Sequence, residues 1–195
     1  MMYDASIFKS YFEQMDNEKI VKLTKRCLEN APHDFWEMPA STTGKYHPGY
    51  ALGYGGLVRH TLSALYFACS MLDLQMFSKL RVKKSEILSA LILHDTVKKG
   101  NSKNFTSFEH PLYSAKLVEK TAQKLTRETE DEEYLRLGES ISQLIAAHMG
   151  QWNTSPYSKT VLPRPKNSLE SFVHLCDYLA SRKGDDNVLS YIENQ

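Results

Sequence analysis

The segment LILHDTVKKG, residues 91–100, decides how the rest of the chain is interpreted. Its apolar run, Leu91 to Leu93, continues a helical pattern and ends abruptly in His94 and Asp95. An imidazole and a carboxylate at the end of a buried face have two explanations. They form the solvated end of an ordinary helix, or they are half of a metal site whose other ligands lie far away in the sequence.

Helical periodicity dominates the chain on both sides of this segment. Apolar residues three and four positions apart predict amphipathic helices, and the stretch 57–74 is apolar on most of its surface, which predicts a central helix. Only KTVLP, 159–163, has a modest strand pattern. The fold class is therefore all-α, with six or seven helices and two long irregular loops, 31–56 and 150–168. The predicted helices span 16–31, 57–74, 85–95, 110–125, 131–149 and 169–184, with a short helix in the tail after them.

Composition sets the broad class of the protein. The 195 residues include 42% apolar and 24% charged residues, which is typical of one soluble globular unit. We expect residues 1–45 to form an N-terminal helical segment that packs on a body formed by 46–195. With 24 basic and 23 acidic residues the net charge is +1. The chain therefore lacks the overall positive charge that would indicate nucleic-acid binding, although a local patch of basic residues stays possible.

Cysteine usage and hydropathy indicate the compartment. The three cysteines, Cys27, Cys69 and Cys176, are isolated and form no CxxC pair, which favours a reducing environment over a disulfide framework. Charged residues interrupt the first turns of the chain, and no apolar run approaches 18 residues. These features predict a cytoplasmic protein with no signal peptide, no membrane-spanning helix and no membrane partner.

Histidine and aspartate residues recur on or beside the apolar faces of five predicted helices. Taken singly, a histidine on such a face is more often a hydrogen-bonded core residue, with a prior for metal ligation below roughly one in five. Together, buried imidazoles and carboxylates are costly unless they satisfy one another, and helices that pack as a bundle can bring them to a shared metal ion. The set comprises His60, His94, Asp95, His110, His148 and Asp177.

The order and local context of these residues resemble a known family. GYGGLVRHTLSAL around His60, ALILHDTVKKG around His94, AAHMGQW around His148 and LESFVHLCDYLASRKG around Asp177 are similar to motifs of the HD-domain superfamily of metal-dependent phosphohydrolases. The nearest likeness is to the HD domain of YhaM-type 3′–5′ exoribonucleases. The resemblance covers about residues 46–184 and implies an HD-domain helical bundle.

The resemblance also implies roles for individual residues. One divalent ion would be held by His60, His94, Asp95 and Asp177, and Asp95 would bridge to a second ion held by His110 and His148. Mixed nitrogen and oxygen ligands suit Mn, Fe, Co, Ni or Zn, bound as one or two ions. The expected reaction is hydrolysis of a phosphomonoester or phosphodiester by a metal-activated water, with Asp95 and Lys98 as catalytic residues.

Other residues are candidates for substrate binding. Lys98, one turn after His94, can neutralise phosphate charge or simply offset the helix dipole. The loop 150–168 carries Trp152, Lys159 and Arg164, which either clamp a base and a phosphate or belong to a plain solvated loop. His174 lies three residues before Asp177, where we expect it to support the site or orient Asp177 rather than bind metal.

The chain departs from the family pattern at three places. Val97 stands where many relatives have glycine, and Met149 follows His148 where exonuclease-type relatives often have a second histidine. The first 45 residues look helical, whereas those exonucleases carry an OB-fold. A nucleotide, cyclic nucleotide or short single-stranded oligonucleotide is therefore the expected substrate. The alternatives are a di-iron oxygenase of the same fold and a non-catalytic metal-binding or sensing module. The sequence leaves the oligomeric state open.

Overall fold

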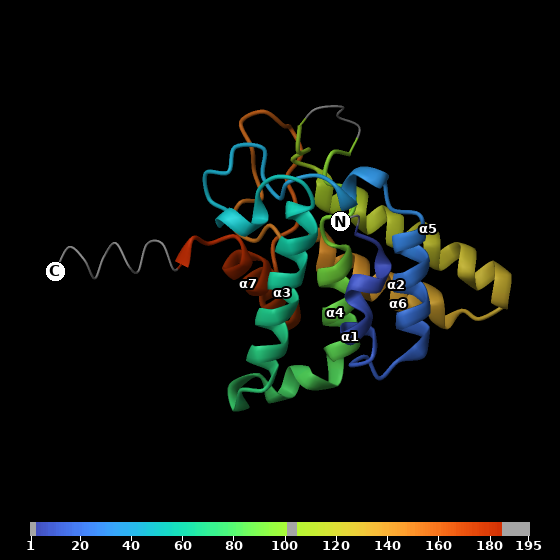
Figure 1. Cartoon of the computed structure of the whole chain (residues 1–195). Coiled ribbons are helices and arrows are strands. Elements are labelled where there is room, and N and C mark those ends of the chain that lie inside the picture. Colours follow the sequence, from blue (N-terminus) through green and yellow to red (C-terminus); the bar gives the residue numbers. More distant parts are fainter. Residues whose placement is uncertain (1–2, 101–104, 185–195) are drawn as a thin grey trace.

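The computed structural model describes residues 3–100 and 105–184, and these form an all-helical bundle without any strand (Figure 1). The prediction of an all-α fold is confirmed. The segment KTVLP is an extended loop, in which Leu162 N–H donates to the Asn153 carbonyl at 2.9 Å. The α-helices are α1 (Lys9–Phe12), α2 (Glu18–Glu29), α3 (Gly56–Leu72), α4 (Lys84–Leu93), α5 (His110–Thr129), α6 (Glu133–Ala146) and α7 (Ser168–Ala180), and the 3-10 helices are η1 (Ala5–Phe8), η2 (His33–Trp36), η3 (Gly49–Ala51) and η4 (Gln75–Lys83).

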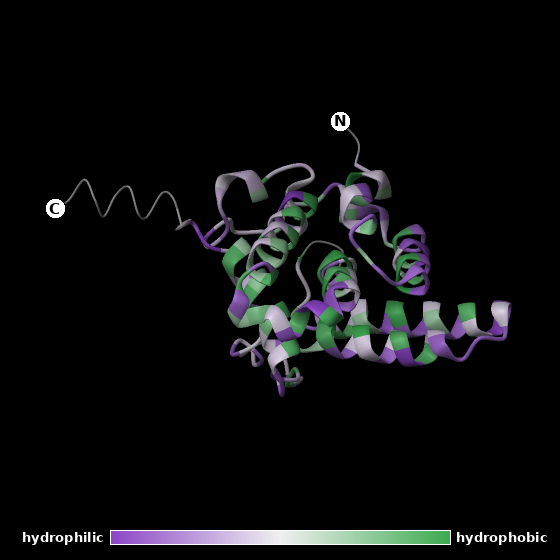
Figure 2. Ribbon diagram, turned by 90° about the horizontal axis from the view of Figure 1, so that it is seen from below, coloured by the Kyte–Doolittle hydropathy of each residue, from purple (hydrophilic) through white to green (hydrophobic). Residues whose placement is uncertain are grey.

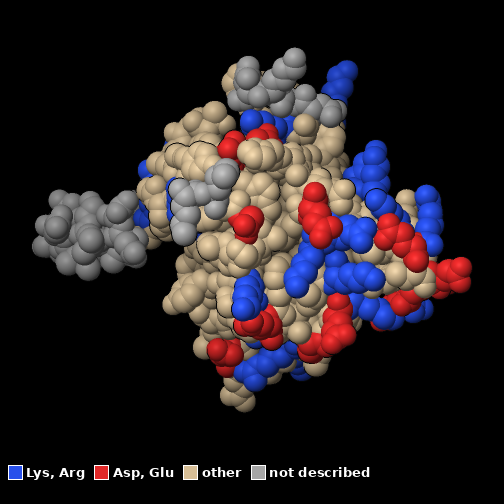
Figure 3. All heavy atoms as spheres, turned by 45° about the vertical axis from the view of Figure 1, so that its right-hand side comes forward, with Lys and Arg blue, Asp and Glu red and all other residues tan. Residues whose placement is uncertain are grey.

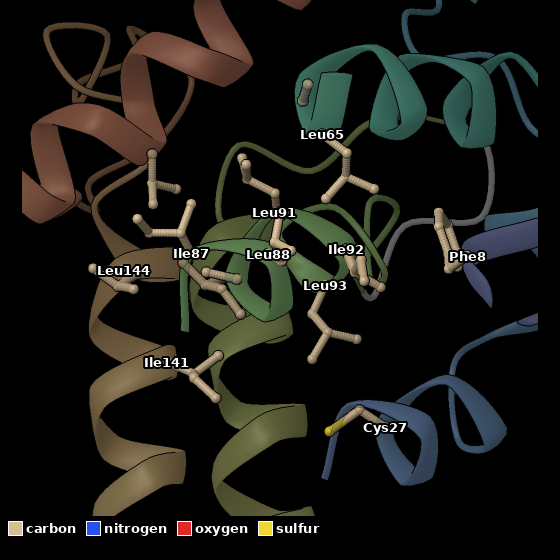
Figure 4. Packing of buried hydrophobic residues seen from close by; sticks show 14 of the residues in the cluster. Phe8, Cys27, Leu65, Ile87, Leu88, Leu91, Ile92, Leu93, Ile141 and Leu144 are labelled. Atoms are coloured by element: carbon tan, nitrogen blue, oxygen red, sulfur yellow. The ribbon is translucent and has the colours of Figure 1, made fainter. Parts of the chain in front are cut away.

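Helix α4 is the centre of the bundle. Every residue from Ser85 to Leu93 is buried, because α4 packs against α2, α3, α6 and α7 at once. Figure 4 shows side chains of α4 meeting Leu65 of α3 and Ile141 of α6, and Figure 2 shows α4 enclosed by its neighbours. A helix that is apolar all round belongs in a core. Helix α3, predicted as a central helix, also packs on α4 and α7 through its buried residues, but it leaves Tyr66 64% exposed.

The few polar side chains of α4 have partners inside the protein. Ser89 Oγ lies 2.6 Å from Thr24 Oγ1 of α2, and Ser85 Oγ donates to the Asp16 carboxylate. Asp16 N–H in turn donates to Ser85 Oγ at 3.0 Å. Because buried hydroxyl groups without partners would cost free energy, these pairs let polar residues occupy the core. They also fix the register of the N-terminal segment against α4.

Helices α5 and α6 form an antiparallel hairpin that projects to the right in Figure 1. The two helices approach closely at Gly138, where an added Cβ would overlap the Cβ of Ala122. Since the hairpin is antiparallel, the first residue of α5 and the last residues of α6 lie at the same end. That end carries His110 and His148.

The irregular segments gather at one end of the bundle. The loops around residues 31–55 and 150–167 lie at the top of Figure 1, beside the end of α4 that leads into His94. Figure 3 shows basic and acidic side chains interspersed on the right and lower parts of the visible face, while the upper left part carries few charges. Among the described residues, no helix is both long and apolar enough to cross a membrane. The short helix predicted in the tail lies outside the described residues.

Candidate metal centre

Six side chains from five helices or their ends converge at the loop end of the bundle. His60 lies in the second turn of α3, His94 and Asp95 directly follow α4, and His110 is the first residue of α5. His148 follows the end of α6, and Asp177 lies within α7. All except Asp177 are at most 2% exposed, and the Asp177 side chain is 18% exposed. The structure thus brings together His60, His94, Asp95, His110, His148 and Asp177.

One half of the cluster is built around Asp177. His60 Nε2 lies 2.9 Å from Asp177 Oδ1, and His94 Nε2 lies 3.5 Å from the same oxygen. Side-chain donor atoms of these three residues all lie within 4.8 Å of one another. That spacing is compact enough for one ion to reach all three.

The other half is built around Asp95. His110 Nε2 lies 3.0 Å from Asp95 Oδ1, and His148 Nε2 lies 3.7 Å from it. His94 Nε2 is 3.3 Å from Asp95 Oδ2. Donor atoms of His94, Asp95 and His148 again lie within 4.8 Å of one another. His94 therefore belongs to both halves, so the two groups are contiguous.

The local backbone sets the orientation of three of these histidines in the same way. Each ring places Nδ1 2.7 Å from the carbonyl oxygen three residues earlier. A carbonyl oxygen has two lone pairs, so Ser107 and Ile145 accept these ring hydrogens although each also accepts the backbone N–H of the same histidine. Because a carbonyl can only accept, Nδ1 carries the hydrogen, and in a neutral ring Nε2 is a bare lone pair. The pairs are His94 with Leu91, His110 with Ser107 and His148 with Ile145.

The result is a buried cluster with more acceptors than donors, although Lys98 Nζ donates to Asp95 and His60 Nε2 pairs with Asp177. The Nε2 atoms of His110 and His148 face each other at 3.2 Å, although both rings have committed their Nδ1 hydrogens elsewhere. Asp95 Oδ1, His94 Nε2 and His60 Nδ1 are buried without a hydrogen-bond partner. Lone pairs and carboxylate oxygens at such distances repel unless a cation lies among them. The donor set of imidazole nitrogens and carboxylate oxygens fits a divalent transition metal.

The pKa values follow from the same arrangement. Burial opposes charge on the His94 ring, but the Asp95 and Asp177 carboxylates outweigh it and raise the pKa of His94 to about 10. Burial lowers the pKa of His148 to about 3. Burial also acts against both carboxylates, yet the surrounding cations and imidazoles hold the pKa of Asp95 and of Asp177 well below the ordinary range. Both carboxylates therefore stay ionised, and in the metal-free protein the Lys98 ammonium and the proton favoured on His94 balance them. A divalent ion that binds here would displace the His94 proton.

Lys98 completes the charge balance beside Asp95. Its Nζ donates to Asp95 Oδ2, and its side chain is only 10% exposed. The turn after α4 that presents it is held by Val97 N–H, which donates to Ser114 Oγ at 3.1 Å. Among the described residues, Glu130 alone is a non-glycine with positive φ, so the turn does not require glycine at 97.

A cavity of about 350 Å³ opens beside the cluster. Trp152 and Tyr178 stack in its wall with ring centroids 5.4 Å apart and planes 15° apart. The Arg182 guanidinium lies 4.6 Å from the Tyr178 ring centroid. The lining also includes Lys98, His110, His148, Met149, Asp177, His47 and Ser41 to Thr43.

Two residues that line the cavity, Tyr178 and Arg182, were not among the candidates predicted from the sequence. Tyr178 adjoins Asp177 on α7, and Arg182 follows one turn later, a spacing that could have flagged both. His47 differs from these two, because its place just before PGYALGYGG had suggested the mouth of the pocket, and it does line the cavity. Its ring lies 5.1 Å from the His60 ring, and burial lowers its pKa to about 4.

Two of the substrate-binding candidates lie away from the cavity. Lys159 is exposed and Arg164 Nε donates to Asn153 Oδ1 at 3.0 Å, and neither residue lines the cavity. His174 was expected to support the site or orient Asp177. Its Nδ1 donates to the His148 carbonyl oxygen at 2.6 Å, so the ring contacts the backbone of a residue of the cluster.

Comparison with known proteins assigns the chain to a family. Neither the curated proteins nor the solved structures include a match to this chain. The HD domain family, whose members are mostly metal-dependent hydrolases that bind divalent metals, matches residues 57–182. That range is more than half of the chain and contains all six converging residues. The chain therefore belongs to the HD domain family.

Proposed function

We propose that this protein is a phosphohydrolase that cleaves a phosphomonoester or phosphodiester bond of a nucleotide, cyclic nucleotide or short single-stranded oligonucleotide. The observation that carries the proposal is the buried acceptor cluster next to Lys98 in the wall of a cavity. Membership of the HD domain family supports it. The YhaM-type likeness of the motifs favours a substrate that contains nucleotides.

The residues divide into two sets of metal ligands. His60, His94 and Asp177 form the first set, and Asp95 with His110 and His148 forms the second, with His94 adjoining both. When bound, divalent ions such as Mn, Fe, Co, Ni or Zn supply Lewis acidity and an activated water for attack on phosphorus. Asp95 is the natural bridging residue, since its two oxygens face different partners, Oδ1 towards His110 and Oδ2 towards His94 and Lys98.

Lys98 is the residue we assign to the phosphate group. Its ammonium already sits against Asp95 at the cavity wall, so a phosphate oxygen that enters beside Asp95 lies within reach. A compact cation suits phosphate. The catalytic roles of Asp95 and Lys98 are part of this proposal.

The far wall of the cavity suits a planar group. The Trp152–Tyr178 stack and the Arg182 guanidinium offer flat surfaces of the kind that hold nucleobases. A volume of about 350 Å³ is near the lower end of the 300–1,000 Å³ typical of ligand sites. A single nucleotide, or the end of a short strand, matches this space better than a long polymer.

One observation favours a second candidate function. Four imidazoles against two carboxylates form a nitrogen-rich donor set, which also suits iron and therefore oxygenase chemistry. Oxygen-dependent turnover by protein loaded with iron under anaerobic conditions would favour that alternative over hydrolysis.

The decisive experiment measures metal content and phosphoester hydrolysis together. Purified protein loaded with Mn²⁺ is assayed against an aryl phosphate, an aryl phosphodiester and a panel of nucleotides. Asp95→Asn should abolish hydrolysis, whereas Asp131→Asn, which changes a partly exposed carboxylate paired with Lys19 far from the cluster, should leave it intact. Full activity of Asp95→Asn would contradict the proposal.

A further inference from the structure

His174 makes a contact that links two parts of the metal centre. It lies on α7 one turn before Asp177, and its Nδ1 donates to the main-chain carbonyl of His148, 26 residues earlier, at 2.6 Å. His148 lies just after the end of α6, where the helix supplies no N–H for that carbonyl. The bond therefore ties the turn that follows α6 to α7.

Two successive hydrogen bonds thus define the position of His148 Nε2. The first, from His148 Nδ1 to the Ile145 carbonyl at 2.7 Å, fixes the ring relative to its own backbone. The second, from His174, fixes that backbone relative to α7. Without the second bond, His148 would keep its ring orientation but lose its fixed distance from Asp95.

The surroundings of His174 are shaped to hold its ring in this place. Gly150, with φ of +58°, passes so close to the ring that an added Cβ would overlap its atoms. On another side the Trp152 ring centroid lies 5.8 Å away. A ring enclosed between a glycine and an indole has little freedom to turn, so the donor stays aimed at the His148 carbonyl.

The two ends of this link are not equally anchored. Helix α7 is held in the core by its own buried residues, whether or not His174 makes its bond. The turn after α6 is shorter and depends more on that bond. Loss of the bond should therefore displace His148 and leave Asp177 in place. The residues that anchor α7 are Phe172, Val173, Cys176 and Ala180.

From these contacts we propose that His174 is a positioning residue for the second metal ion only, the one assigned to Asp95, His110 and His148. The inference rests on the two-ion site of the proposed function. It predicts unequal effects on the two ions, because His60, His94 and Asp177 do not depend on the His148 backbone. A general contribution to folding would weaken both ions alike.

The test compares two substitutions that place an amide nitrogen differently. In His174→Asn the amide nitrogen occupies the place of Nδ1, so it can still donate to the His148 carbonyl. In His174→Gln the chain is one methylene longer and the nitrogen falls nearer the place of Nε2. Gly150→Ala disturbs the same ring from the other side, and Ser171→Ala, one turn earlier on α7, is the control.

Mn²⁺ binding to each full-length variant is measured by isothermal titration calorimetry, with thermal melting of the metal-free protein as a check on folding. His174→Gln and Gly150→Ala should weaken the second Mn²⁺ about 10–100-fold, the usual effect of losing an orienting partner, and leave the first unchanged. His174→Asn and Ser171→Ala should bind both ions as the unmodified protein does.

The outcomes separate this inference from the proposed function. Unmodified protein that takes up no Mn²⁺ would overturn both. Unmodified protein that binds two Mn²⁺ ions, with both affinities unchanged or equally weakened in His174→Gln, would overturn the positioning role and leave the proposed function standing. Uptake of a single ion by the unmodified protein would also overturn the positioning role, because no second site would exist.

Discussion

His148→Asn separates the two functions of this residue, orientation and metal binding. The asparagine amide can keep the hydrogen bond to the Ile145 carbonyl, while the Nε2 lone pair that faces His110 is lost. The free energy of unfolding of the metal-free variant should therefore lie within about 1 kcal/mol of that of the unmodified protein. The retained hydrogen bond and the loss of the repulsion between the two Nε2 atoms offset the small void that the shorter side chain leaves. The increase in the free energy of unfolding that Mn²⁺ causes, in contrast, should be smaller in this variant.

The size of that fall can be worked out from linkage. An ion at a concentration 100 times its Kd stabilises the unmodified protein by about 2.7 kcal/mol. For a chain of this length, each kcal/mol raises Tm by about 2–4 °C, so the expected rise is about 5–11 °C. Losing a direct ligand should cost at least the roughly 10–100-fold in affinity that loss of an orienting partner costs. At the same Mn²⁺ concentration the second ion would then contribute at most about 0.4–1.4 kcal/mol, or about 1–6 °C, while the first ion would stabilise the variant as before.

Differential scanning calorimetry with Mn²⁺ and with a chelator gives both numbers. His33→Asn is the matched control, because His33 is 77% exposed and lies outside the cluster. If His148→Asn kept the full Mn²⁺-dependent rise in Tm, His148 would not be a ligand and the assignment of the second ion would fail.

Three further substitutions test other parts of the structure. Lys98→Met should weaken inhibition by inorganic phosphate roughly tenfold or more, because a hydrogen bond to a charged group contributes about 1.5–3 kcal/mol; unchanged inhibition would remove Lys98 from the phosphate site. Leu91→Ala should lower the free energy of unfolding by about 2–5 kcal/mol in urea titrations, since Leu91 is fully buried in α4; a loss below that range would mean that the core there is loosely packed. Gly138→Val should destabilise by about 1–3 kcal/mol by forcing α6 away from Ala122, and wild-type stability would show that the hairpin tolerates a wider separation.

Periodicity predicted the six longer α-helices, because such a pattern depends only on nearby residues, but it did not predict α1 or the 3-10 helices individually. It also could not tell which apolar helix is enclosed on every side. Residues 57–74 and 85–95 are both rich in apolar side chains, and their burial depends on which neighbours cover them, which local sequence does not record. In the structure α4 is enclosed and α3 keeps one side exposed.

In the candidate site, too, some features could be predicted from local sequence and others could not. The chemistry of His60, His94 and Asp177 on apolar faces was visible in the sequence, and the structure brings these side chains together. The course of a long loop was not visible, so Lys159 and Arg164 were assigned to a cavity that they do not line. The bond from His174 to a main-chain carbonyl could not be foreseen, since its acceptor has no side-chain signature.

The contact between Gly138 and Ala122 has a consequence for ion selectivity. Gly138 lies ten residues before His148, about 15 Å along a helix, yet it fixes how near α6 runs to α5. Those helices carry His148 and His110 at their shared end, with the two Nε2 atoms 3.2 Å apart. In the proposed two-ion site, the diameter of the cation that would fit between these nitrogens is therefore set in part by a position that does not touch it. A larger residue at 138 would shift the preference towards bigger ions without altering any ligand.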